Sequence, residues 1–215
     1  MVDSDKKHSR QIERAYNTQD KISHYAEWAP SYEADLQRSG YQAPAHAVAL
    51  MKKLVPVTAQ IIEFGCGSGL VGRQLADTGY QRIVGVDVSP EMLKLAANGQ
   101  PYQSLREHDL TKPLLDDIRY EAGICVGVCA FGPLMADHIV HMTSVLIENA
   151  PLLLTVNGRA WSELDWPEKL DDAQQRYGFT IEYINTIPYL TEENIDGKLL
   201  VIRNHAIESE LYVQK

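Results

Sequence analysis

The stretch from residue 61 to residue 69, Ile-Ile-Glu-Phe-Gly-Cys-Gly-Ser-Gly, constrains the fold of this chain more than any other. A short apolar run of this kind is typical of a buried β-strand. The alternating glycines predict a turn whose backbone closely approaches a ligand. Residues 70–78 then predict a helix whose first N–H groups are free to face that ligand. The pattern therefore indicates a site for a nucleotide-like cofactor.

A second apolar run, residues 83–86, ends in Asp87. In doubly wound sheets, an acid that follows the second strand at about this distance from the glycine turn hydrogen-bonds the ribose of a bound nucleotide. Asp87 is therefore our candidate ribose ligand.

Predicted strands and helices alternate from residue 60 onward. We expect strands at residues 60–64, 82–87, 102–106, 122–128, 152–156, 179–187 and 198–207. Helices are expected at residues 70–77, 90–97, 134–149 and 161–177. This order predicts an α/β fold, with a doubly wound, Rossmann-like, mostly parallel seven-stranded sheet. Helices would cover both faces, and the C-terminal strand would be antiparallel.

The N-terminal segment precedes this alternation. Residues 1–21 are polar and predict a flexible tail, or a helix that a ligand or partner orders. Apolar side chains then recur three and four residues apart up to residue 36, which predicts an amphipathic helix broken near Pro30. Residues 45–55 predict a second helix that ends before Pro56. We expect residues 22–215 to form one domain, with residues 22–55 as a lid over the cofactor.

Charge and cysteine content limit the partners of the chain. A formal net charge of −9 over 215 residues disfavours extended contact with nucleic acid. The three cysteines cannot all be paired in disulfides, so reduced thiols in the cytoplasm are the simpler interpretation. No apolar run approaches the roughly 18 residues of a membrane span. We expect a cytoplasmic protein without a membrane partner, and the oligomeric state stays open.

The glycines can be phased in two ways. Counted from Gly67, they satisfy the G-x-G-x-x-G fingerprint of dinucleotide sites, with Gly69 and Gly72 as its later members. The first glycine of such a loop follows its strand directly, however, and that glycine is Gly65. Glu63 would then repel a pyrophosphate over the loop and attract a cation. S-adenosylmethionine offers that cation in its α-amino group and has no phosphates.

Residues 61–69, together with residues 85–93 (Gly-Val-Asp-Val-Ser-Pro-Glu-Met-Leu), resemble the class I S-adenosylmethionine-dependent methyltransferases. Residues 25–36 and 40–44 narrow the resemblance to the methyltransferase-like proteins typified by the Williams–Beuren syndrome region protein. The resemblance covers residues 22 to about 157. It implies methyl transfer from S-adenosylmethionine, with S-adenosylhomocysteine as product, and we infer a small-molecule acceptor.

The resemblance also implies individual roles. Glu63 would hold the methionine amino group, directly or through water, Asp87 both ribose hydroxyls and Asp109 the adenine amino group. The full set implied to bind the cofactor is Tyr25, Tyr32, Glu63, Gly65, Cys66, Gly67, Asp87, Val88, Met92, Asp109, Leu110, Val126 and Gly127. One departure is the turn before the fifth strand, where residues 148–151 (Glu-Asn-Ala-Pro) replace the usual glycines and leave the local geometry open.

No catalytic constellation stands out, because an activated sulfonium needs a positioned acceptor more than a base. Weak candidates for a base are His46, His138 and His141, although a histidine of this kind is more often a surface or helix-capping residue. Candidate acceptor contacts are Trp28, Phe131 and Trp161, and core packing is the competing interpretation for the two tryptophans. No metal site is expected, since Cys125 and Cys129 have no neighbouring histidine.

Rival functions stay open at this point. Methylation of nucleic-acid bases is disfavoured, because residues 127–132 lack the Asn/Asp-Pro-Pro-aromatic sequence of the amino-methylating enzymes. The main alternative is a protein that binds S-adenosylmethionine without methyl transfer, either as a regulatory subunit or for a different reaction. A nicotinamide-dependent reductase is a more distant alternative. A small protein acceptor also stays open, since it needs no basic surface.

Overall fold

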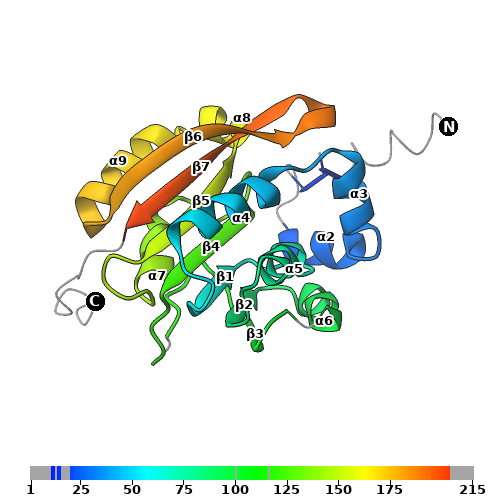
Figure 1. Ribbon diagram of the computed structural model, residues 1–215. Helices are drawn as coiled ribbons and strands as arrows, with labels where there is room; N and C mark the ends of the chain where they lie inside the picture. The colour runs from blue at the N-terminus through cyan, green and yellow to red at the C-terminus, as the bar shows by residue number, and fades with distance from the viewer. Residues whose placement is uncertain (1–10, 13, 16–19, 100, 116, 204–215) are drawn as a thin grey trace.

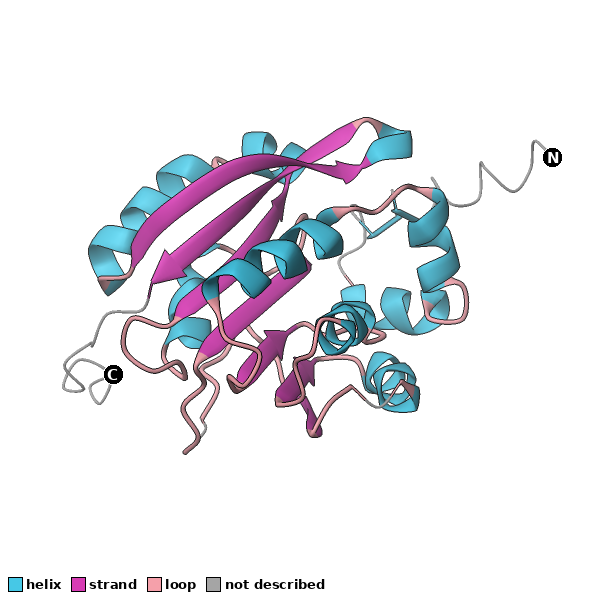
Figure 2. Ribbon diagram, viewed as in Figure 1, coloured by secondary structure: helices cyan, strands magenta, loops and turns pink. Residues whose placement is uncertain are grey.

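The chain folds around a single mixed sheet of seven strands, as a computed structural model that describes residues 11–12, 14–15, 20–99, 101–115 and 117–203 shows (Figures 1 and 2). The strands are β1 (Ile61–Phe64), β2 (Ile83–Asp87), β3 (Ser104–Glu107), β4 (Ala122–Cys129), β5 (Pro151–Asn157), β6 (Thr180–Leu190) and β7 (Ile195–Arg203). Their spatial order is β3-β2-β1-β4-β5-β7-β6. Strands β1 to β5 pair in parallel, and β7 pairs antiparallel to both β5 and β6. The predicted fold class is confirmed.

Alternate residues of the central strands face two separate cores, as the two-residue period of a strand requires. Ile61 and Ile83 pack with α4 (Ala43–Leu54) and α5 (Leu70–Asp77). Ile62 and Val84 pack on the other face with α7 (Ile139–Thr143) and α9 (Trp166–Tyr177). Apolar side chains at both sets of positions explain why these strands read as unbroken hydrophobic runs.

The remaining helices flank this framework. They are α2 (Lys21–Trp28), α3 (Tyr32–Arg38), α6 (Pro90–Asn98), α8 (Gly158–Glu163) and the 3₁₀ turns η1 (Ala136–His138) and η2 (Thr191–Glu193). The break expected near Pro30 falls between α2 and α3. No helix in the described ranges is long and apolar enough to cross a membrane. Of the expected tail, residues 1–10, 13 and 16–19 lie outside the described residues, and residues 11–12 and 14–15 are helical.

The helix expected at residues 134–149 is wrong at both ends, because residues 134–135 are not helical, Ala136–His138 is the 3₁₀ turn η1, and the α-helix α7 spans only Ile139–Thr143. Helix α7 ends at Thr143, and the next residues pair with Tyr120 instead: Tyr120 donates to the Val145 carbonyl over 2.9 Å, and Ile147 donates to the Tyr120 carbonyl over 2.9 Å. Val145 and Leu146 are buried through this bridge. Their apolar spacing suggested a helix because burial in either conformation requires the same residue types.

The helix expected at residues 161–177 is two helices. Asp165 takes a left-handed conformation, with φ of 53°, between α8 and α9. Pro167 stands in the first turn of α9, and a proline restricts the helical conformations available to the chain before it. The last strand, β7 (Ile195–Arg203), begins three residues before the expected start at residue 198, and residues 204–207 lie outside the described residues.

The turn before β5 is built without the expected glycines. Asn149 takes a left-handed conformation, with φ of 60°, which asparagine tolerates better than most residues. Its carbonyl accepts a hydrogen bond from Arg203 Nη1 at 2.9 Å. Asn149 therefore supplies the left-handed conformation that a glycine usually supplies in this turn.

Asp35 joins α2 to α3 at the N-terminal end of the domain. The residue is 5% exposed and accepts hydrogen bonds from Trp28 Nε1 at 2.8 Å and Ser31 Oγ at 2.8 Å. Its other oxygen accepts from Arg38 Nη1 at 2.9 Å. In Figure 1 the two helices lie together beside α5 and α6, over the side of the sheet formed by β1 and β2.

Replacing Asp35 with alanine should lower the free energy of unfolding by about 1–3 kcal/mol, because the buried Trp28 N–H loses its acceptor. Urea unfolding would measure the change. The matched control is Asp77→Ala at an exposed position on α5, whose free energy of unfolding should stay within about 0.5 kcal/mol of that of the unsubstituted protein. Equal effects of the two substitutions would contradict a role for Asp35 as the link.

Candidate active site

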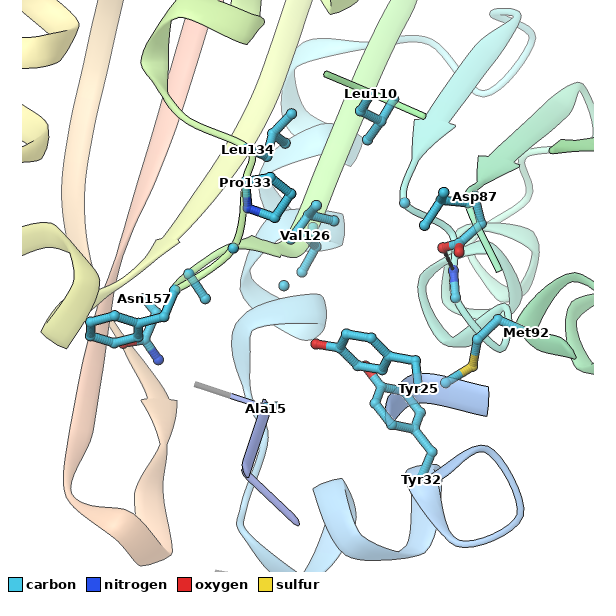
Figure 3. A pocket seen from close by; sticks show the side chains of 18 of the residues that line it. Ala15, Tyr25, Tyr32, Asp87, Met92, Leu110, Val126, Pro133, Leu134 and Asn157 are labelled. Carbon is cyan, nitrogen blue, oxygen red and sulfur yellow. Dashed lines mark hydrogen bonds between the residues drawn. The ribbon is translucent and has the colours of Figure 1, made fainter. Parts of the chain in front are cut away.

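A pocket of about 430 Å³ opens over the carboxyl ends of the parallel strands. This edge is where doubly wound sheets bind their ligands, and the volume is typical of small-molecule sites. Figure 3 shows Asp87 and Met92 on one side of the pocket and Asn157 on the other, with Tyr25 and Tyr32 between them at its N-terminal wall. The pocket thus extends from the end of β2, past β1 and β4, to the end of β5.

The glycine loop after β1 forms the floor. Gly65, Gly67 and Gly69 have φ angles of +70°, +52° and +87°, so left-handed conformations begin at the first residue after the strand. The phase counted from Gly65 is therefore the one that matches the geometry. A Cβ built on Gly67 would meet no atom within 4 Å, and Gly67 lines the pocket. Because glycine has no Cβ, a ligand can approach the backbone at Gly67 more closely than it could with any other residue there.

Asp87 ties this loop to the end of β2. One carboxylate oxygen accepts from Gly67 N at 2.8 Å, and the other accepts from Ser89 N at 2.9 Å. Burial raises the pKa of Asp87, while these backbone N–H groups act in the opposite direction. Each carboxylate oxygen can accept a second hydrogen bond. Asp87 can therefore hold the loop and still bind a ligand hydroxyl.

The wall beyond Asp87 is apolar and ends in an acid. Val88 is 37% exposed, whereas Met92 and Leu110 are buried, and all three line the pocket. Asp109 also lines the pocket, and its Oδ1 accepts from the backbone N–H of Thr111 at 3.0 Å. Hydrogen bonding by Thr111 lowers the pKa of Asp109. Asp109 thus caps a local turn and stays ionised at the pocket edge, while its contact with adenine stays a prediction.

Glu63 and Cys66 lie behind the loop and outside the main pocket. They line an adjoining cavity of about 30 Å³, which shares Gly65 and Gly67 with the pocket and has room for about one water molecule. Glu63 is 2% exposed and accepts a hydrogen bond from Tyr102 Oη at 2.8 Å. Burial raises the pKa of Glu63 to about 8. Burial likewise raises the pKa of the Cys66 thiol.

Aromatic side chains of α2 and α3 form the N-terminal wall. Trp28 and Tyr32 pack edge to face with ring centroids 4.8 Å apart, and Tyr25 contacts Tyr32 at 6.0 Å. All three line the pocket, so Trp28 is both a buried core residue and part of the site. Ile12 and Ala15, from the described part of the expected tail, line it as well.

Some sequence candidates lie elsewhere. His46 is on α4, and His138 and His141 are on η1 and α7; none of the three lines the pocket. Burial lowers the pKa of His141. Trp161 also stays outside the pocket and packs against the core of α7 and α9, with Lys198 Nζ 5.8 Å from its ring centroid. Phe131, by contrast, lines the pocket as expected.

Sequence reasoning missed several lining residues. Asn157 follows from the position of its strand, because it ends β5 as Asp87 ends β2. Tyr41 and Tyr189 carry no local signal, since they come from the segment before α4 and from antiparallel β6. The missed residues include Leu36, Tyr41, His108, Thr111, Pro133, Leu134, Asn157, Tyr189 and Leu190. Within the described ranges there is no cluster of three or more His, Cys, Asp or Glu side chains that could hold a metal ion.

Comparisons with known proteins point to methyltransferases. A family profile described as "Methyltransferase domain" matches residues 61–147. Human methyltransferase-like protein 27 is 32% identical over 130 residues, which is 57% of this chain and 53% of that protein. Ribosomal protein L11 methyltransferase of Aeromonas hydrophila is 27% identical over 117 residues, 49% of this chain and 40% of that protein. The chain thus spans about half the length of the curated relatives it matches, or less.

Among solved structures, magnesium protoporphyrin IX methyltransferase from Synechocystis, with bound S-adenosylhomocysteine, superposes with a TM-score of 0.62. The alignment covers 91% of this chain and 93% of the other at 16% identity, so it bears on the fold alone. The fold is therefore the Rossmann-like one that this solved methyltransferase also has. The profile match over residues 61–147 and the methyltransferase relatives support the resemblance to the class I S-adenosylmethionine-dependent methyltransferases that the sequence motifs predicted.

The burial of Glu63 predicts a pH-dependent stability. The pKa of about 8 means that folded Glu63 keeps its proton up to about pH 8, whereas an unfolded glutamate releases it near its ordinary pKa of 4.5. The folded state therefore binds more protons between these values, and its stability should fall as the pH rises from about 5 to about 8, by at most about 1.4 kcal/mol per pH unit for this group. Urea unfolding at several pH values, compared with the neutral isostere Glu63→Gln, isolates the contribution. Identical pH profiles for the two proteins would contradict it.

Proposed function

We propose that this chain transfers a methyl group from S-adenosylmethionine to a small-molecule acceptor. The observation that carries the proposal is the composition of the main pocket. Of the thirteen residues that the motifs assign to the cofactor, eleven line this one pocket, and the other two line the small cavity directly behind it. Five separate segments of the chain contribute to the set, so chance proximity along the sequence does not account for it.

The proposed placement follows the chemistry of each wall. Adenine would pack between Val88, Met92 and Leu110, with its amino group at ionised Asp109. The ribose hydroxyls would donate to Asp87, and the methionine part would lie on the open backbone of Gly67. These groups offer hydrogen-bond acceptors and apolar surface, and no Lys or Arg side chain among the described lining residues offers a partner to a pyrophosphate. This favours S-adenosylmethionine over a nicotinamide dinucleotide.

Glu63 would hold the methionine ammonium through one water molecule in the cavity behind the loop. The carboxyl group is buried and its pKa is raised to about 8, so it is mainly protonated at neutral pH before the ligand arrives. A cation close to it would favour its ionised form. We therefore propose that Glu63 releases its proton as the cofactor binds.

Once held by these residues, S-adenosylmethionine would supply an activated methyl group for the acceptor and would leave as S-adenosylhomocysteine, with the acceptor proton released to solvent. The contribution of the chain would be to position and desolvate the reactants. The bulge in β4 serves the first task. Its register against β5 shifts between Cys125 and Cys129, and Val126, Gly127 and Val128 between them line the pocket. The aromatic wall of α2 and α3 would exclude water as a lid.

The small-molecule acceptor is the finer part of the proposal. The Aeromonas relative is named for methylation of a ribosomal protein, so a protein acceptor is the competing hypothesis. A pocket whose far end is lined by buried or half-buried aromatic side chains favours a small acceptor. A cytoplasmic location belongs to the same proposal and is supported by three buried cysteines, each a free thiol. The net charge of −9 argues against a nucleic-acid partner.

Calorimetry should show that Asp87→Ala weakens binding of S-adenosylhomocysteine by about tenfold or more, because a charged hydrogen-bond acceptor contributes about 1.5–3 kcal/mol. Asp77→Ala, the same substitution at an exposed position on α5, is the matched control and should bind normally. Circular dichroism would verify that both variants are folded, since Asp87 also holds Gly67. Unchanged affinity in folded Asp87→Ala would remove this residue from the site.

The main alternative is a protein that binds the cofactor without transferring its methyl group. Incubation with labelled S-adenosylmethionine and metabolite extracts distinguishes the two: the proposal expects label in a small molecule and S-adenosylhomocysteine as product. Tight binding with no S-adenosylhomocysteine formed would favour the alternative. Binding of NAD(P)H in place of S-adenosylmethionine would contradict both.

A further inference from the structure

Two tyrosines meet at the end of the pocket that lies away from Asp87. Tyr41 precedes α4 and Tyr189 lies on β6, and their rings pack edge to face with centroids 5.3 Å apart. Their hydroxyl groups share a hydrogen bond. Both residues line the pocket, and neither was found from the sequence. The backbone segments that carry the two tyrosines are also joined, because Gln42 N donates to the Tyr189 carbonyl at 3.0 Å.

The hydroxyl of Tyr41 lies directly on Gly127. A Cβ built on Gly127 would collide with Tyr41 Oη, and Gly127 has a φ of +82°. The bulge in β4 is also tied to the neighbouring strand β5, since Gly127 N donates to the buried Thr155 Oγ1 at 3.0 Å. Gly127 is the residue that the proposed function puts beside the methyl group. Tyr41 Oη therefore borders the place where the acceptor nucleophile must lie.

This phenol pair is chemically suited to hydrogen bonding and unsuited to proton abstraction. Burial raises the pKa of Tyr41 well above its ordinary value, so its hydroxyl stays protonated at neutral pH. A phenol oxygen keeps acceptor capacity while its own proton is shared with another oxygen. Tyr41 can thus accept an N–H or O–H of the acceptor and direct the nucleophile's lone pair without acting as a base.

The charges of the pocket exclude one class of acceptor. Its described lining includes three carboxylates, those of Asp20, Asp87 and Asp109, and no Lys or Arg. Tyr41 bridges to Leu190, and its N–H donates to the Leu36 carbonyl; both leucines line the pocket, as do the apolar Phe131 and the polar Asn157. A carboxylate or phosphate on the acceptor would lose its water there without a Lys or Arg among the described lining residues, since Arg159, whose guanidinium carbon lies 5.8 Å from the Phe131 ring centroid, is not one of them.

We propose that the Tyr41–Tyr189 end of the pocket binds an uncharged, aromatic or otherwise apolar acceptor whose nucleophilic N–H or O–H donates to Tyr41. The assignment rests on the proposed function, because it takes Gly127 as the border of the methyl group. Tyr41 is a positioning residue in this account, and Tyr189 fixes the orientation of its hydroxyl.

Three naphthalene probes test the assignment, with affinities measured by calorimetry on full-length protein saturated with S-adenosylhomocysteine near neutral pH. They are 2-naphthol, its methyl ether, which lacks the O–H, and 6-hydroxy-2-naphthoate, which adds a carboxylate. We expect 2-naphthol to bind about tenfold more tightly than the ether, as one buried hydrogen bond predicts. We expect the naphthoate to bind at least about tenfold more weakly than 2-naphthol.

Tyr41→Phe should remove the preference for 2-naphthol over its ether and leave the affinity for S-adenosylhomocysteine within about threefold. A purely structural role would lower both probe affinities together and keep their ratio. Tyr189→Phe should reduce the ratio partly. Tyr183→Phe, on the exposed face of the same strand, is the control that should change nothing.

The outcomes separate this proposal from the one it rests on. If S-adenosylhomocysteine fails to bind, the proposed function fails and this assignment fails with it. If S-adenosylhomocysteine binds but the naphthoate binds as tightly as 2-naphthol, only the assignment of an uncharged acceptor is overturned. An unchanged naphthol-to-ether ratio in Tyr41→Phe, or binding of none of the three probes, would overturn it as well.

Discussion

The pair of hydrogen bonds that Asp87 makes to backbone N–H groups is the interaction on which the site depends. The bond to Gly67 holds a loop of left-handed glycines against the end of β2, and the bond to Ser89 starts the turn into α6. Strands β1 and β2 alone would bring two loops close together. Asp87 fixes them in one arrangement, in which the open backbone of Gly67, the apolar face of Met92 and the carboxylate itself face a single pocket.

Much of the fold could be predicted because strong periodicity and local turn chemistry agree over residues 60–130. Strands buried on both faces give unbroken apolar runs, and Ser89, Pro90 and Glu91 mark a helix start that the structure confirms through the Ser89 Oγ bond to Met92 N. The predictions failed where residues are buried in a conformation other than the one that their apolar spacing suggests. Val145 and Leu146 are as buried as helical residues would be, but they bridge to Tyr120, a contact that no local pattern encodes.

The site divides in the same way. Residues within the strand–loop motifs, such as Gly65, Gly67, Asp87 and Leu110, lie together in the pocket as predicted. Their function in cofactor binding stays a prediction. Tyr41 and Tyr189 could not be found, because an isolated bridge between the segment before α4 and the end of β6 brings them together. Glu63, which the resemblance assigns to the methionine amino group directly or through water, lies behind the loop, accepts a hydrogen bond from Tyr102 and lines a water-sized cavity; its contact with a ligand stays a prediction.

The central claim is that the pocket over the glycine loop is the seat of S-adenosylmethionine. A crystal structure of the protein soaked with S-adenosylhomocysteine tests it most directly. The account predicts ribose oxygens within hydrogen-bond distance of Asp87, adenine against Met92 and Leu110, and one water molecule between the amino group and Glu63. S-adenosylhomocysteine bound elsewhere, or with its ribose away from Asp87, would contradict the account.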